Sequence, residues 1–460
     1  MRARTLVSAL ALTALLSGAA IAAPKPAPPP AAASQQVSPR QAVAGIAQAI
    51  EDRYFDPAKG KTVADDLRAA AKRGEFDALT DPRDLAQALT RRLQPLDHHF
   101  TVSWPVDAPP EGQGPGGPGP GGPGPGPGPG PGGPGPGPRG DDPFEVRQNY
   151  GFRHADILPG NIGYIDLHGF SDIDFADPNS GARAAADTAL AMVSHTDAVI
   201  IDLRDNGGGA PSMVGYLTSA FTPKDANIYN TFHSRGGDFS EAPGVYYPHP
   251  RLTVPVYILV SARTASAAEA LSYTLQTAGR AVIVGEASAG AANPGGPVPA
   301  GNRFAIFVSQ GAPENPISHK NWEGGGVQPD VTVPSADALT RARILILEGL
   351  AKTDLPDDQK TANQWALEGL KAENAPPLAI NADDYVGIYS GVTVAATPQG
   401  LTYQRGRRPA WSLVALGSDR FTVRDEPSRR LIFQRDASGK VVAVDSVSVD
   451  GSSQHLRRGE

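Results

Sequence analysis

The sequence predicts a mixed α/β core that is preceded by a helical part and followed by a small antiparallel β domain. Within residues 149–334, apolar runs of strand length alternate with stretches of helical spacing. These strand candidates are apolar throughout rather than alternating, which indicates a sheet that is covered on both faces. After Tyr385, short runs of alternating polarity are separated by turns that contain Gly or Asp, as in an antiparallel β domain.

The chain of 460 residues is long enough for two or three domains and at least one large core. Changes in composition suggest where its segments begin and end. We predict a signal peptide (1–22), a Pro/Ala-rich spacer (23–36), a helical N-terminal part (37–107), a Gly/Pro-rich linker (108–140), the α/β core (141–340), a helical connector (341–380) and the C-terminal β domain (381–460).

The first residues are typical of a secretory signal. Arg2 and Arg4 precede an apolar run over 6–16, and Ala20-Ile21-Ala22 offers a small-x-small cleavage site. The run is too short to span a bilayer and no later run is long enough, so we expect no membrane anchor. The absence of cysteine excludes both a lipidated cysteine and a disulfide framework. We therefore expect a periplasmic or secreted protein.

The net charge of −7 argues against a nucleic-acid partner, because nucleic-acid-binding chains are usually basic. Spacings of the HxH, HExxH or CxxC type are absent, so we predict no metal and no cofactor. The sequence does not decide whether the protein forms a homo-oligomer.

Each element of the core has its own pattern in the sequence. Before the core, Val43, Ile46 and Ile50 recur at helical spacing, and 100–102 is a candidate short strand. The predicted core strands are 162–167, 198–203, 254–260, 281–284 and 304–308, and the predicted helices are 182–193, 212–221, 265–277 and 336–352. In the last domain the predicted strands include 401–403, 420–423, 431–433 and 441–449.

Ser266 is the most informative candidate residue. It follows the apolar strand 254–260 and opens a predicted helix, so the free N–H groups of the first helical turn, including that of Ala267, face a site where negative charge can develop. A second strand runs into Gly207, Gly208 and Gly209, which allow backbone amides to approach a ligand closely. A serine beside two sets of amides indicates acyl transfer.

A serine hydroxyl needs a base, and His99 is the best candidate among nine histidines. It ends the helical part just before an apolar strand, whereas the others that we considered (His168, His195, His233, His249 and His455) lie among polar or turn residues and are expected at the surface. A buried, satisfied imidazole and a metal ligand are the alternatives for His99. A histidine base predicts that kcat/KM falls below about pH 6 to 7.

Glu323 can orient the histidine as the third member of a triad, or it can simply be satisfied by amides of its Gly-rich loop. Glu269 lies one helical turn after Ser266 and is expected to bind nearby backbone or Arg204. Asp202 and Arg204 are expected to form an ion pair at the end of their strand.

These motifs, in this order, resemble the tail-specific (C-terminal processing) protease family, and within it the branch of the tricorn core protease and the interphotoreceptor retinol-binding protein. The resemblance covers residues 37 to about 340, with the linker as an insertion. The matching segments are 149–152, 158–164, 202–209, 264–269, 284–286, 289–294 and 321–330.

The resemblance implies a crotonase-like core with Ser266 as the nucleophile, and with the amides of Ala267 and Gly208 as the oxyanion donors. The tricorn-like arrangement implies that His99 and Glu323 complete the triad, and it leaves the role of His98 open. Members with a Ser–Lys dyad carry the lysine at a position that falls here on Ala291, so the dyad is absent. A PDZ-like insertion is not visible either.

The sequence thus predicts an exported serine peptidase that cleaves peptides or proteins by a Ser-His-Glu acyl-enzyme mechanism. The alternative is a non-catalytic binding protein for apolar ligands or peptides on the same scaffold. An esterase with a nucleophile elbow is disfavoured, because Ala265 and Ala267 flank Ser266 in place of the glycines of Gly-x-Ser-x-Gly.

Overall fold

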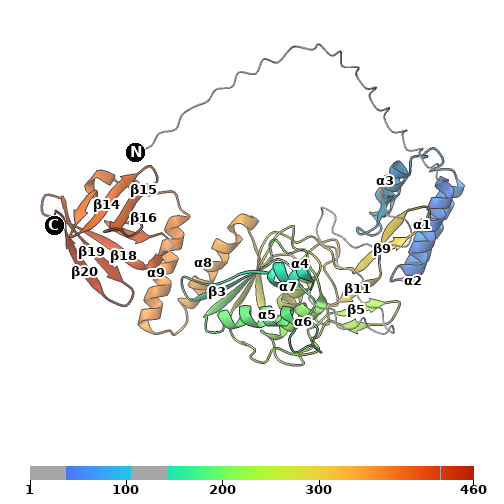
Figure 1. Ribbon diagram of the computed structural model, residues 1–460, viewed down its shortest axis with the longest axis horizontal. Helices are drawn as coiled ribbons and strands as arrows, with labels where there is room; N and C mark the ends of the chain where they lie inside the picture. The colour runs from blue at the N-terminus through green and yellow to red at the C-terminus, as the bar shows by residue number, and fades with distance from the viewer. Residues whose placement is uncertain (1–37, 105–141, 425, 460) are drawn as a thin grey trace, which may run out of the picture.

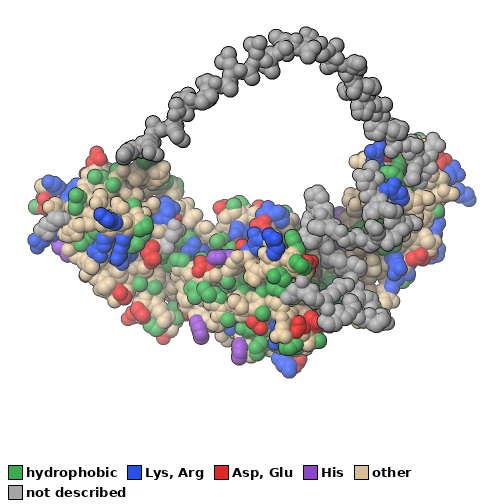
Figure 2. Space-filling view, in the orientation of Figure 1, with side chains coloured by type: hydrophobic (Ala, Val, Ile, Leu, Met, Phe, Trp, Pro, Cys, Tyr) green, Lys and Arg blue, Asp and Glu red, His purple; other side chains and the backbone are tan. Residues whose placement is uncertain are grey.

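The computed structural model describes residues 38–104, 142–424 and 426–459. The predicted signal peptide, the spacer and the whole of the predicted linker lie outside these residues. Figure 1 shows the N-terminal helices at one end of the molecule, the α/β core in the middle and the C-terminal β domain at the other end. Figure 2 shows basic and acidic side chains interspersed over the described residues of one face. Within the described part, no helix is long and apolar enough to cross a membrane.

The core is built on a six-stranded sheet of order β12-β8-β7-β4-β3-β2, in which only β2 runs antiparallel to its neighbour. The strands are β2 (Phe152–Leu158), β3 (Ile162–Leu167), β4 (Ala198–Asp202), β7 (Val256–Val260), β8 (Ala281–Gly285) and β12 (Val331–Thr332). Four of these match predicted strands closely, because each is a continuous apolar run.

Both faces of this sheet are covered, as the continuous apolar strands predict. Alternate residues of one strand point to opposite faces. In β4, for example, Val199 and Ile201 belong to one buried cluster and Ala198 and Ile200 to another. The first face packs on α5 (Gly181–Met192), α6 (Pro211–Ser219) and α7 (Ala267–Thr277), and the second packs on α8 (Ala338–Leu350) and α9 (Asp357–Glu373).

The segment expected as a helical connector packs against both the core and the C-terminal β domain. Leu347 and Leu370, from α8 and α9, lie in the buried cluster on the second face of the core sheet. On the other side of α9, Arg430 of the β domain donates a hydrogen bond to the carbonyl of Trp365 and lies over its ring. α9 thus joins the core to the last domain.

The N-terminal part consists of helices packed on a small sheet to which the core contributes two strands. The helices are α1 (Pro39–Arg53), α2 (Pro57–Lys72) and α3 (Pro82–Leu93). The sheet has the order β1-β10-β9, with β1 (Thr101–Ser103), β9 (Gly295–Pro299) and β10 (Ala305–Ser309). The predicted strand at 304–308 is real, but it lies here and not in the core sheet, because Ile306 and Val308 pack against the N-terminal helices.

Several short elements were not predicted. They are α4 (Pro143–Arg147), η1 (Asn149–Gly151), η2 (Ser335–Asp337) and a three-stranded sheet of β5 (Thr231–Ser234), β6 (Phe239–Ser240) and β11 (Gly311–Glu314). The longest of them, α4, has five residues, which is too short for a periodic pattern to stand out.

The C-terminal domain is an antiparallel sheet in which eight strands follow one another in chain order, after η3 (Ala382–Asp384). The strands are β13 (Gly387–Tyr389), β14 (Val392–Thr397), β15 (Gly400–Arg405), β16 (Trp411–Gly417), β17 (Arg420–Val423), β18 (Glu426–Arg435), β19 (Val441–Ser448) and β20 (Ser453–Arg457). The predicted mixed α/β fold with N-terminal helices and a C-terminal antiparallel domain is thus confirmed.

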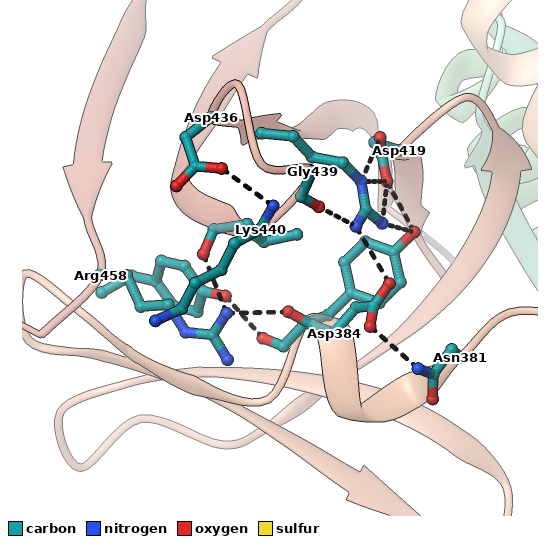
Figure 3. Close-up of polar contacts among 11 residues, drawn as sticks. Asn381, Asp384, Asp419, Asp436, Gly439, Lys440 and Arg458 are labelled. Atoms are coloured by element: carbon teal, nitrogen blue, oxygen red, sulfur yellow. Dashed lines mark hydrogen bonds and ion pairs between the residues drawn. The ribbon is translucent and has the colours of Figure 1, made fainter.

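The first and last strands of this sheet meet, so it is a nearly closed barrel. Ser390 N–H donates to the carbonyl of Arg457, and Gly459 N–H donates to that of Ile388. Figure 3 shows the polar contacts around this closure, where Arg458 donates to the carbonyl of Asp384 and Asn381 donates to the Asp384 carboxylate. Closure leaves fewer unpaired strand edges, which are a site of aggregation.

Candidate active site

Ser266 lies at the junction between β7 and α7, as predicted, and its backbone conformation is unusual. Its φ of 54° and ψ of −119° fall in a region that side chains other than glycine rarely adopt. Strain of this kind costs on the order of 1–3 kcal/mol and persists only where the surroundings enforce it. The sharp turn makes Ser266 project from the junction between β7 and α7 rather than form part of the helix.

Buried Glu269 holds that turn in place. Its carboxylate accepts hydrogen bonds from the backbone N–H of Ser266 (2.7 Å), Gly290 (2.6 Å) and Ala291 (2.9 Å), and from the Ser288 hydroxyl (2.6 Å). Burial raises the pKa of Glu269, while these donors act in the opposite direction. The prediction of a backbone partner for Glu269 is confirmed. Arg204 instead pairs with Asp202, as the ion-pair prediction required.

Asn206 ties the glycine turn to the serine turn, and the sequence analysis did not identify it. The residue is fully buried. Its side-chain amide donates to the carbonyl of Leu167, its carbonyl accepts from Ala265 N–H, and its Oδ1 accepts from Gly208 N–H at 2.8 Å. Asn directly before glycines is a turn signal, but the signal does not say which strands the side chain will bridge.

This arrangement changes the predicted role of Gly208. Its N–H is already bonded to Asn206, so in this structure it does not face the serine as a free donor. A methyl group on Gly208 would lie 2.7 Å from the Ser266 Cβ and 3.1 Å from the Ala267 nitrogen, so the glycine permits close approach. Across the described residues, the amides of Gly207, Gly209 and Ala267 donate no hydrogen bond.

His99 lies between two carboxylates, of which only one was predicted. Its Nδ1 is 3.2 Å from Glu323 Oε1 and also 3.2 Å from Asp97 Oδ1, and its backbone N–H donates to the same Asp97 oxygen. The sequence therefore selected a His–Glu pair that the fold brings together, but missed Asp97. The signal for it was its place two residues before His99.

The loop that follows β8 positions Glu323. Glu323 Oε2 accepts hydrogen bonds from the N–H groups of Ala292 (2.9 Å) and Asn293 (3.0 Å). These residues directly follow Ala291 in the sequence. The same stretch of backbone thus binds Glu269 on one side and Glu323 on the other, and both carboxylates are anchored by amides.

The electrostatics of this cluster favour a charged imidazole. Burial disfavours the charged form of His99, but the hydrogen bonds and charges of Asp97 and Glu323 outweigh it and raise its pKa to about 9. Burial also acts on Asp97 in the direction of protonation, and its contacts with His99 overcome this and lower its pKa to about 2. The imidazole stacks on Phe307 of β10, with ring centroids 5.8 Å apart.

Not all of the predicted residues are joined. No hydrogen bond links the Ser266 hydroxyl to His99 in the described part of the chain. His98 is exposed, and a methyl group on Gly324 would lie 3.4 Å from its ring. The histidines predicted to lie at the surface are exposed: His168, His195, His233, His249 and His455.

Comparison with known proteins identifies the region that carries this site. The sequence model of the family described as "Peptidase family S41" matches residues 161–333. The carboxyl-terminal-processing protease of Picosynechococcus sp. is 29% identical over 175 residues, or 38% of this chain and 39% of that protein. The carboxy-terminal processing protease CtpB of Bacillus subtilis is 26% identical over 214 residues, or 46% and 42%. The chain thus spans less than half the length of these curated relatives.

Among solved structures, a putative peptidase from Parabacteroides merdae is 16% identical with a TM-score of 0.46, covering 69% of this chain and 100% of that one. The family match includes Ser266, the glycine turn and Glu323, and it begins after Asp97 and His99. Residues 161–333, within the α/β core, are therefore similar to the tail-specific (C-terminal processing) proteases of peptidase family S41.

Proposed function

We propose that this protein is an exported serine peptidase that uses Ser266, His99 and Glu323, with Asp97 as a fourth member. The observation that supports the proposal most is the His99 imidazole, whose Nδ1 faces two buried or half-buried carboxylates. That arrangement fixes the tautomer with the proton on Nδ1 and leaves Nε2 as the acceptor for a hydroxyl proton. Substrates are proposed to be peptides or proteins, since the curated relatives are named as processing proteases.

In the proposed reaction, the Ser266 hydroxyl attacks the peptide carbonyl while His99 Nε2 takes its proton. The Nδ1 proton of the imidazolium is then shared with Asp97 and Glu323. The oxyanion is held by Ala267 N–H and by one of the two glycine amides that donate no hydrogen bond, on Gly207 or Gly209. His99 then returns the proton to the leaving amine, and water releases the acyl group.

Because no hydrogen bond joins Ser266 to His99, the catalytic contact has to form when substrate binds. Catalytic hydrogen bonds are commonly long or misaligned in free enzymes. His99 precedes β1, and β1 is held by pairing with β10. A small approach of the N-terminal part toward the core would bring the imidazole closer to the serine.

The direct test is hydrolysis of an unstructured peptide by wild type and by Ser266→Ala. The variant is expected to lose about 10⁴-fold in kcat with unchanged folding, because the nucleophile is removed. Full hydrolysis by a folded Ser266→Ala protein would exclude Ser266 as the nucleophile. A folded wild type that hydrolyses no peptide would favour the binding protein.

Export rests on residues 1–22, outside the described part of the chain. Fractionation of cells that express the full chain, with mass determination of the mature N-terminus, tests it. A protein recovered outside the cytoplasm and starting at Ala23 is expected, and an uncleaved cytoplasmic protein would contradict the proposal.

A further inference from the structure

Three potential metal ligands converge around His99 Nδ1. The nitrogen lies 3.2 Å from Asp97 Oδ1 and 3.2 Å from Glu323 Oε1, and one ligand atom from each of the three residues lies within 4.8 Å of the others. The ligands come from the end of the N-terminal helical part and from a loop more than 200 positions later. For this reason no spacing motif in the sequence predicts the cluster.

The cluster contains more negative charge than one imidazole proton can satisfy. Nδ1 carries a single proton, which cannot satisfy both carboxylates fully although each lies 3.2 Å from it. Glu323 Oε1 and Asp97 Oδ2 are both buried and accept no hydrogen bond of full geometry, although the Tyr54 and Ser309 hydroxyls lie close enough to Asp97 to interact with its carboxylate. The Asp97 side chain is only 2% exposed. Two carboxylates held around one imidazole nitrogen carry an excess of negative charge in a largely buried place, and a cation between the three groups would neutralise both carboxylates together.

The spacing and the ligand types fit zinc. Zinc binds nitrogen and oxygen ligands at about 2.0–2.2 Å with tetrahedral geometry, which places neighbouring ligand atoms roughly 3.3–3.5 Å apart. The two separations from Nδ1, 3.2 Å each, agree with this value, and all three ligand atoms lie within 4.8 Å of one another, so a small movement of the carboxylates would complete the geometry. Calcium and magnesium prefer six or more oxygen ligands, so an imidazole with two carboxylates favours a transition metal such as zinc. His99 and Glu323 keep about a fifth of their side-chain surface exposed, which gives an ion access.

We propose that Asp97, His99 and Glu323 form a Zn²⁺ site that overlaps the catalytic base, so that bound zinc reversibly inhibits the enzyme. Zinc replaces the proton on Nδ1, and the neutral imidazole then carries its remaining proton on Nε2. An Nε2–H group cannot accept the Ser266 proton, so the base is lost while Ser266 itself stays intact. Binding of zinc stands independently of the activity, whereas its inhibitory consequence rests on the proposed function.

The test uses full-length Ser266→Ala protein without a histidine tag, stripped with EDTA and dialysed. Isothermal titration with ZnCl₂ is expected to show one site per chain. Adding His99→Gln should abolish the site, and adding Asp97→Asn or Glu323→Gln should weaken binding about tenfold or more, because each removes one charged ligand. Both amides keep an oxygen for the backbone N–H groups that the carboxylates bind, so these variants are expected to fold.

His233→Gln is the matched control. His233 also lies between two carboxylates, Asp238 at 3.0 Å and Glu314 at 3.7 Å, but these face different ring nitrogens and the side chain is 47% exposed. Its loss should leave the zinc affinity unchanged. Equal zinc affinity with and without His99, or no saturable binding below about 1 mM zinc, would overturn the site.

Activity separates this inference from the proposed function. Zinc should abolish peptide hydrolysis by the wild type, and EDTA should restore it. If Ser266→Ala binds zinc through His99 but the wild type hydrolyses no peptide, the metal site stands and the proposed function fails. If the wild type hydrolyses peptide and zinc neither binds at His99 nor inhibits, the metal site fails and the peptidase stands.

Discussion

At the scale of single residues, the position of Asp97 decides how the candidate base behaves. With Glu323 alone, His99 would resemble the histidine of an ordinary triad. Burial alone would lower the pKa of His99, but Asp97 and Glu323 on the same nitrogen together raise it to about 9. A base must be neutral to accept a proton, and a raised pKa keeps His99 charged until the pH approaches that value. The acidic limb of the kcat/KM profile, expected from the sequence near pH 6 to 7, therefore moves to higher pH.

The pH dependence of metal-free enzyme tests this effect. In EDTA, kcat/KM of the wild type is expected to rise with pH until about pH 9, the pKa of free His99. Asp97→Asn removes one negative charge, lowers the His99 pKa and should move this limb to lower pH by about one unit or more. Stopped assays across pH 5–10 measure both profiles. Identical limbs in the two proteins would show that Asp97 does not influence the base.

At the scale of elements, the turn before α7 and the loop after β8 are fixed by hydrogen bonds to carboxylates. Glu269 accepts four hydrogen bonds and fixes the turn before α7, and Glu323 accepts two from the loop after β8. A carboxylate offers only acceptors, which suits a site that presents only donors. The backbone geometry of Ser266 therefore depends on the hydrogen bonds that Glu269 accepts.

Glu269→Gln is therefore expected to be strongly destabilising. The new NH₂ group would face donors that it cannot satisfy, at a cost of about 3 kcal/mol in the free energy of unfolding. Urea unfolding followed by circular dichroism measures the difference. Glu348→Gln, on the surface of α8, is the control and should leave the stability nearly unchanged, because its ion pair with Lys371 is open to solvent. Similar losses in both variants would contradict a structural role for the buried carboxylate.

The sequence predicts elements better than contacts. Strands β7, before Ser266, and β8, after α7, could be predicted because each is a continuous apolar run that ends in a turn. The second acceptor of His99 and the bridging role of Asn206 could not, because both depend on which distant chain segments the fold brings together. The strand at 304–308 was predicted as a strand but not in its sheet, since an apolar pattern does not name its partner.

At the scale of the whole molecule, His99 and Ser266 belong to two parts that meet through the sheet β1-β10-β9. Gly45 of α1 lies directly against this sheet. A methyl group there would lie 2.0 Å from the carbonyl oxygen of Ala300, a backbone atom that cannot rotate away. The fit of the helices against the sheet therefore controls where β1, and with it His99, stands relative to the core.

Gly45→Ala should lower kcat/KM by about 10²-fold, the usual consequence when a catalytic group is displaced by roughly 1 Å. Gly349→Ala is the matched control, because Gly349 also lies in a helix but has open space around its Cα. It should keep full activity and gain about 0.5–1 kcal/mol in stability. Steady-state kinetics with thermal unfolding compares the two. Equal activity in both variants would exclude a close fit of α1 as a requirement for catalysis.

The measurement that tests the central claim most directly is labelling of the purified, metal-free protein with a fluorophosphonate at about pH 9, the pKa of His99, followed by intact mass determination. An activated serine predicts one adduct per wild-type chain, no adduct on Ser266→Ala and strongly slowed labelling of His99→Ala. A folded wild type that takes up no probe, or a Ser266→Ala protein that is labelled like the wild type, would contradict the account.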